Sequence, residues 1–194
     1  MLKLNMGCGH NKRPGFINVD AFAECAPDQV ADLEVTPWPW PSDCADEVLF
    51  IHSLEHMGGD PKVFLAIMKE LYRISADGCV VRIHAPHPRH DNFLSDPTHV
   101  RAITPKMMLL FDREMNDRVI AAGGANSPLA RYLGVDFELV QQRVTAEPAY
   151  LQKLERGEIT RERLQELLDT AFNVGREFQL ELRVHKPVRA GTVT

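Results

Sequence analysis

The chain has 194 residues, of which 44% are hydrophobic and 25% charged, a balance that is typical of one globular domain and excludes wholesale disorder. A formal net charge of −5 offers no basic excess for displacing counterions from phosphates, so no nucleic-acid partner is expected. No apolar run is long enough for a membrane span, and the four cysteines, which form no Cys-x-x-Cys pair, are interpreted as reduced thiols of a cytoplasmic protein.

Short apolar runs separated by loops fill the first half of the chain, and they predict the strands of a parallel sheet. The predicted strands are residues 2–6, 15–20, 29–33, 47–52 and 79–84. Between the third and the fourth of these, Pro37, Pro39 and Pro41 alternate with Trp38 and Trp40. Prolines cannot donate the hydrogen bonds of a β-ladder, so a loop is expected there.

The clearest predicted helix follows the fourth strand. Asp60 is a favourable N-cap, and Pro61 suits the first helical position, where its missing N–H is not needed. Apolar residues then recur at helical spacing from Val63 to Leu71, and Asp77-Gly78 is interpreted as the end of the helix. Strand, helix and strand in this order are typical of a βαβ unit.

The second half of the chain predicts two further helices and two longer strands. One helix begins at Thr104-Pro105 and runs through residues 107–111, and an amphipathic helix covers residues 160–172. A strand is expected at residues 137–145. Residues 177–185 alternate apolar and polar side chains, which indicates a half-exposed antiparallel strand.

The end of the first strand carries the strongest functional signal. Gly7-Cys8-Gly9 follows it directly, and glycines allow a ligand to approach the backbone closely. Asp20 ends the second strand, where a carboxylate can accept hydrogen bonds from both hydroxyls of a ribose. Ligands of open α/β sheets bind outside the carboxyl ends of the strands, so these residues are expected to share one site.

In the order of these motifs, the sequence resembles the class I S-adenosylmethionine-dependent methyltransferases, especially small members whose first strand runs into Gly-Cys-Gly and whose second ends in Asn-Val-Asp. The resemblance covers about the first 90 residues. Its further matches are Ala31-Asp32-Leu33, the loop at residues 38–40, the segment at residues 42–46, and His52-Ser53-Leu54-Glu55-His56.

The resemblance implies S-adenosylmethionine as the cofactor and S-adenosylhomocysteine as the product. The residues that it assigns to cofactor binding are Asn5, Gly7, Cys8, Gly9, Asp20, Asp32, Leu33, Ile51 and His52. Backbone groups of residues 7–9 would line the methionine moiety, and Asp20 would hold the ribose. Asp32 and the backbone N–H of Leu33 would contact the adenine edge, while Ile51 and His52 would pack near the sulfonium.

The sequence departs from the family pattern in two places. Asn5 stands where the family usually has an acid, and the residues between Gly9 and Asn18 are too few for a full crossover helix. A nicotinamide-binding site is the weaker alternative, because Lys12 occupies the position of the third glycine in Gly-x-Gly-x-x-Gly and Asp20 comes too early.

Histidines are concentrated after the fifth strand, at His84, His87, His90 and His99. Their spacing matches no metal-ligand pattern, and prolines within the segment exclude a helix that would present two of them on one face. No metal site is therefore predicted, and residues 84–99 are expected to form a loop that faces the substrate. The candidates for the base that accepts a proton during methyl transfer are His52, His56 and His87.

The sequence thus predicts one α/β domain, residues 1–194, with a Rossmann-like, doubly wound, mostly parallel sheet, an antiparallel last strand and a shortened first crossover. Residues 1–85 would form the cofactor-binding half and residues 86–194 the substrate-facing half. The expected activity is methyl transfer to a small molecule. Two alternatives are a catalytically silent binding or assembly module, favoured by Asn5 and the short crossover, and a metal-dependent enzyme that uses the histidine-rich loop.

Overall fold

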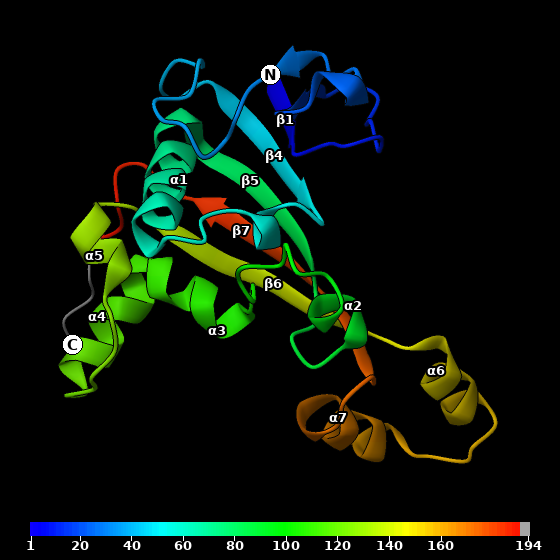
Figure 1. The fold of residues 1–194 in the computed structure, drawn as a ribbon. Helices are drawn as coiled ribbons and strands as arrows, with labels where there is room; N and C mark the ends of the chain where they lie inside the picture. Colours follow the sequence, from blue (N-terminus) through cyan, green and yellow to red (C-terminus); the bar gives the residue numbers. More distant parts are fainter. Residues whose placement is uncertain (191–194) are drawn as a thin grey trace.

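Seven strands form one mixed sheet in the computed structural model, which describes residues 1–190 (Figure 1). The strands are β1 (Leu2–Met6), β2 (Ile17–Asp20), β3 (Gln29–Val30), β4 (Ala45–Ile51), β5 (Ser75–Pro86), β6 (Phe137–Ala146) and β7 (Gly175–Val184). Their order is β3-β2-β1-β4-β5-β7-β6, and β7 runs antiparallel to both of its neighbours. This sheet confirms the predicted fold class. Of the predicted domain 1–194, residues 191–194 lie outside the described part.

The helices follow β4 and the later strands. They are α1 (Pro61–Ile74), α2 (Asp91–Leu94), α3 (Pro105–Met108), α4 (Arg113–Ala121), α5 (Leu129–Leu133), α6 (Pro148–Glu155) and α7 (Arg161–Thr170), with 3-10 turns η1 (Ala23–Cys25), η2 (Leu54–His56) and η3 (Leu109–Phe111). In Figure 1, α6 and α7 stand out beyond the ends of β6 and β7. Among residues 1–190, none of the helices is long and apolar enough to cross a membrane.

Helix α1 forms as its sequence predicts, but it ends earlier. The Asp60 carboxylate accepts a hydrogen bond from Lys62 N at 2.8 Å, and the apolar side chains of the helix pack into the core. The helix ends at Ile74 because β5 begins at Ser75. Asp77-Gly78, interpreted from the sequence as the end of the helix, instead lies at an irregularity inside β5, where Gly78 has a φ of +78°.

The first crossover contains no helix within the described chain. A loop joins β1 to β2, and two buried asparagines hold it: Asn5 Nδ2 donates to Asn18 Oδ1 at 2.9 Å and to Asn11 O at 3.1 Å. Asn18 Oδ1 also accepts from Arg13 N at 2.7 Å. The predicted shortened crossover is confirmed, and the Asn5 amide stabilises this loop.

The two faces of the sheet differ in polarity. One face is apolar and packs against α1, α3 and α5, with buried side chains such as Phe50 and Ile83. On the other face, charged side chains form a row across four strands. Lys3 pairs with Glu47 at 2.8 Å, Glu47 also pairs with Arg82, and Arg82 pairs with Glu181 at 3.1 Å.

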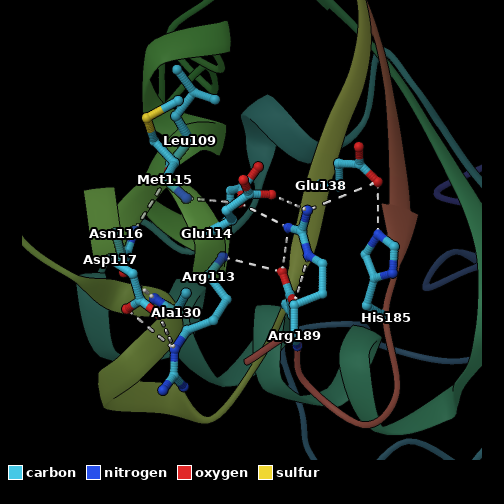
Figure 2. A network of polar contacts seen from close by, with 12 residues as sticks. Leu109, Arg113, Glu114, Met115, Asn116, Asp117, Ala130, Glu138, His185 and Arg189 are labelled. Carbon is cyan, nitrogen blue, oxygen red and sulfur yellow. Dashed lines mark hydrogen bonds and ion pairs between the residues drawn. The ribbon is translucent and has the colours of Figure 1, made fainter. Parts of the chain in front are cut away.

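A second polar network joins the end of the described chain to α4 and β6 (Figure 2). The fully buried Asp136 accepts hydrogen bonds from Arg189 Nε at 2.9 Å and from Arg189 Nη2 at 2.7 Å. Arg189 also pairs with Asp112 at 2.8 Å and with Glu114 at 3.3 Å. Burial alone would raise the pKa of Asp136, but hydrogen bonds from Arg189 and from Arg113 N outweigh it and hold this pKa below its ordinary value.

Candidate functional site

A cavity of about 540 Å³ lies where β1, β2 and β4 end. Its size falls within the range of small-molecule sites, roughly 300–1,000 Å³. The cavity is lined by Gly7, Gly9, Asp20, Ala21, Phe22, Cys25, Ala31, Asp32, Leu33, Glu34, His52, Ser53, His56 and Met57. The structure therefore brings together six of the residues predicted to bind a cofactor: Gly7, Gly9, Asp20, Asp32, Leu33 and His52.

The two positions of the turn require glycine for different local reasons. Both have positive φ, +67° for Gly7 and +49° for Gly9, in the left-handed region that favours glycine. A Cβ on Gly7 would lie 2.6 Å from the Cβ of Ser53, so Gly7 is also required by packing. A Cβ on Gly9 would meet nothing within 4 Å, so the free space of the cavity begins at Gly9.

Asp20 links the glycine turn to the segment after β2. Its Oδ2 accepts from Gly9 N at 2.7 Å, and its Oδ1 accepts from Phe22 N at 3.0 Å. A carboxylate has about four lone-pair sites, so both oxygens can still accept from a ligand. This arrangement suits a pair of vicinal hydroxyls.

The other wall of the cavity combines apolar side chains with two acids. Phe22 is 69% exposed although it is aromatic, and it lines the cavity together with the buried Leu33. Asp32 is exposed, and its Oδ1 accepts from Glu34 N at 2.9 Å. Glu34 in turn accepts a hydrogen bond from Gly58 N, which ties this wall to the segment after η2. A flat apolar ring edged by hydrogen-bonding groups fits such a wall.

Three residues predicted to bind the cofactor do not line the cavity: Asn5, Cys8 and Ile51. Cys8 is buried, and its backbone N–H donates to Val19 O at 2.9 Å, which continues the pairing of β1 with β2. Burial, with the charge of Asp20, raises the pKa of the Cys8 thiol. Sequence reasoning did not assign Phe22 or Met57 to the cavity. An aromatic residue two positions after the strand-ending acid was the available signal for Phe22.

His52 occupies a strained position at the centre of the site. Its φ is +52°, which is uncommon for a residue with a side chain. Its Nε2 lies 2.9 Å from Glu177 Oε2 and its Nδ1 lies 3.6 Å from Glu55 Oε1. The interaction with Glu55 raises the pKa of His52, burial opposes it, and Glu177 adds to the rise.

A second cavity, of about 320 Å³, shares His52 with the first as a lining residue. It is lined by His52, Asn92, Thr145, Ala146, Arg176 and Glu177. His52 directly follows β4, and the other five residues come from α2 and from the adjacent ends of β6 and β7. The hydroxyl of Thr145 is buried and makes no hydrogen bond to any of the described residues 1–190. This second cavity is thus polar, with both charges and free hydrogen-bonding groups.

The remaining histidines of the predicted substrate loop mostly have structural contacts. His87 is buried, its ring lies 4.7 Å from that of Phe178, and burial, with the charge of Arg89, lowers its pKa. His90 caps α2 and lies 3.0 Å from Glu147. Neither lines either of the two cavities described above, so of the three base candidates only His52 and His56 lie at the site.

Comparisons with solved structures place this geometry in a known fold. An S-adenosylmethionine-dependent methyltransferase from Archaeoglobus fulgidus is 18% identical, with a TM-score of 0.58 over 93% of this chain and 85% of that one. A second, from Methanosarcina mazei, is 14% identical, with a TM-score of 0.55 over 94% and 92%. A (4+2)-cyclase is 16% identical, with a TM-score of 0.53 over 96% of this chain and 75% of that chain.

No protein-family model matches the sequence, and the curated proteins give no match either. At the identities above, the likeness to solved structures shows the fold. The chain has the fold of the class I S-adenosylmethionine-dependent methyltransferases, as its sequence motifs predict. The cyclase shares this fold, so the fold alone does not determine the activity.

Proposed function

We propose that this chain binds S-adenosylmethionine in the cavity between β1, β2 and β4 and transfers its methyl group to a small polar acceptor. The observation that carries the proposal is that His52 lines two cavities. One has an acid and a glycine turn suited to a nucleoside, and the other has the polar groups suited to an acceptor. The fold and the methyltransferase neighbours support the same reading.

The polar and apolar groups that line the first cavity fit the cofactor. The free lone pairs of Asp20 suit the ribose hydroxyls, and the open space at Gly9 suits the methionine portion. Phe22 and Leu33 offer the adenine ring an apolar surface, and Asp32 stands at its edge. When bound, S-adenosylmethionine supplies a methyl group activated on a sulfonium.

The contribution of the chain to the reaction is mainly proximity and alignment. Asp20 and the glycine turn would fix the cofactor, and His52 would contact the acceptor at the junction of the cavities. Arg176 and Asn92 would hold polar groups of the acceptor, which favours a small molecule rich in hydroxyl or acidic groups.

The four cysteines are unpaired thiols, which supports a reducing, cytoplasmic location.

Isothermal titration calorimetry with S-adenosylmethionine tests the proposal, with NAD and ATP as controls. We expect one cofactor molecule per chain and no comparable binding of either control nucleotide. His52→Ala should retain cofactor binding but lose the release of S-adenosylhomocysteine with a panel of hydroxylated and carboxylated metabolites. Failure of the wild type to bind S-adenosylmethionine at millimolar concentration would refute the proposal.

A further inference from the structure

Two segments distant in the sequence bring three metal-ligand side chains together beside the cofactor cavity. Glu55 and His56 belong to η2, and His99 follows α2. One ligand atom from each of the three lies within 4.8 Å of those of the other two. Backbone hydrogen bonds hold the segments in place, because Glu55 O accepts from Val100 N at 3.0 Å and from Arg101 N at 3.1 Å.

Glu55 lacks the partners that a buried carboxylate requires. It is fully buried, and neither of its carboxylate oxygens accepts a hydrogen bond from the described residues 1–190. The nearest cationic group is His52 Nδ1, at 3.6 Å. Buried carboxylates are normally paired, hydrogen-bonded or coordinated to a metal, since an isolated buried charge is costly. A cation between Glu55 and the two histidines would supply what is missing.

Hydrogen bonds hold both imidazoles with the Nε2 lone pair available. His99 Nδ1 lies 2.9 Å from the carbonyl of Phe93, which can only accept, so this nitrogen carries the proton. Thr98 Oγ1 donates to Asp96 Oδ1 at 2.6 Å and therefore accepts from His56 Nδ1 at 2.8 Å. Metal-binding histidines almost always donate their second ring N–H in this way, which fixes the ring.

We propose that Glu55, His56 and His99 form a binding site for a divalent first-row transition metal such as zinc. Two imidazole nitrogens and one carboxylate suit zinc, iron or manganese better than magnesium or calcium, which prefer oxygen ligands. Asp96 lies nearby, with Oδ2 3.9 Å from His99 Nε2. Three protein ligands leave a coordination position open, as in catalytic metal sites.

The metal site adds to the proposed function without resting on it, because none of its three ligands depends on a bound cofactor. His56 lines the cofactor cavity, so the ion would lie beside the reacting groups. The proposed site differs from the expectation, drawn from the spacing of histidines within residues 84–99, that no metal binds. That spacing could not indicate the site, because Glu55 and His56 lie outside the segment.

Metal content and thermal stability test the proposal without any activity. The full chain is stripped with chelator and dialysed against zinc at sub-millimolar concentration, and bound ions are counted by elemental analysis. We expect one zinc ion per chain and a rise in Tm of roughly 5–10 °C at saturating zinc, while magnesium alone has no effect. His99→Ala should weaken zinc binding more than roughly 100-fold, beyond the loss typical of an outer-shell partner. The exposed His10→Ala is the control and should retain the ion.

Glu55→Gln separates loss of the metal from loss of folding. The glutamine has the same shape and removes a buried charge that accepts no hydrogen bond, so the metal-free variant should melt at or above the Tm of the metal-free wild type. Zinc should then no longer raise its Tm. The proposal is overturned if the wild type binds no zinc and no manganese, or if Glu55→Gln and His99→Ala bind zinc as the wild type does.

Discussion

The carboxylate of Asp20 accepts a hydrogen bond from the backbone N–H of Gly9, with 2.7 Å between the donor and acceptor atoms. This contact joins the end of β2 to the turn after β1, so the acid and the turn that line the cavity are positioned by one another. The same carboxylate accepts from Phe22 N, which fixes the start of the apolar wall. One side chain thus organises three sides of the proposed cofactor site.

Removing this carboxylate should weaken cofactor binding. Asp20→Ala loses charged hydrogen bonds to the ribose and loosens the glycine turn, so we expect a loss of about 1.5–3 kcal/mol, or roughly 10–150-fold in Kd. Calorimetry with S-adenosylmethionine measures it. Asp77→Ala is the matched control, because Asp77 lies near the start of β5, away from the strand ends that form the cavity. This variant should bind S-adenosylmethionine with normal affinity. Equal affinities of the two variants would contradict this role of Asp20.

Substitution of Gly7 should mainly reduce stability, whereas substitution of Gly9 should mainly reduce cofactor binding. Gly7→Ala places a Cβ against Ser53 and strains a positive φ, so we expect it to destabilise the fold by about 2–4 kcal/mol. A Cβ at position 9 meets no neighbour within 4 Å, so Gly9→Val should cost mainly the backbone strain, about 1–2 kcal/mol. Its side chain enters the cavity, however, and should abolish cofactor binding. Thermal melting and calorimetry on both variants check this contrast, which a folded Gly9→Val with full affinity would disprove.

Phe22 should contribute to binding and not to stability. It is 69% exposed, so Phe22→Ala should change the free energy of unfolding by less than about 0.5 kcal/mol. Loss of its contact with the adenine ring should weaken S-adenosylmethionine binding by about 1–2 kcal/mol, or roughly 5–30-fold. Phe172, which is 59% exposed and lies outside the cavity, provides the control. If Phe172→Ala weakened binding as much as Phe22→Ala, the assignment of the apolar wall would be wrong.

The ion pair between Asp136 and Arg189 should make stability depend on pH. The folded-state pKa of Asp136 lies below its unfolded value of about 3.9. Its contribution is therefore fully present above that value and is lost as the pH falls through the lower folded-state pKa. Asp136→Asn should cost about 3 kcal/mol at neutral pH, because it removes the fully buried carboxylate from the ion pair and leaves Arg189 only its contacts with Asp112 and Glu114.

Urea denaturation at neutral pH and at about pH 3 measures this dependence. The difference in unfolding free energy between Asp136→Asn and the wild type should shrink in acid as Asp136 becomes protonated. Asp169→Asn, which alters an exposed carboxylate, should show little difference at either pH. A difference for Asp136→Asn that is the same at both pH values would contradict the assigned ion pair.

The sequence predicts the parts of the site that are tied to strand ends. Gly7, Gly9 and Asp20 each follow or end a short apolar strand, and parallel strands bring their carboxyl ends to one edge of the sheet. The shortened crossover is also predictable, since the chain between Gly9 and Asn18 is too short for a helix.

Contacts made by irregular segments could not be predicted in this way. His99 lies near Glu55 because hydrogen bonds join two turns that are far apart in the sequence, and no periodicity in the sequence encodes that contact. Asp77-Gly78 reads locally as the end of a helix, but β5 begins at Ser75 because pairing with β4 outweighs the local turn preference. His87 has a side chain suited to catalysis, yet packing against Phe178 buries it away from both cavities.

A crystal structure of the chain with S-adenosylhomocysteine shows directly whether the cofactor binds at Asp20. We expect both ribose hydroxyls to donate to the Asp20 carboxylate, the adenine ring to lie against Phe22 and Leu33, and the sulfur to point toward His52. A nucleoside bound elsewhere on the molecule, with Asp20 keeping only its contacts to Gly9 N and Phe22 N, would contradict this expectation.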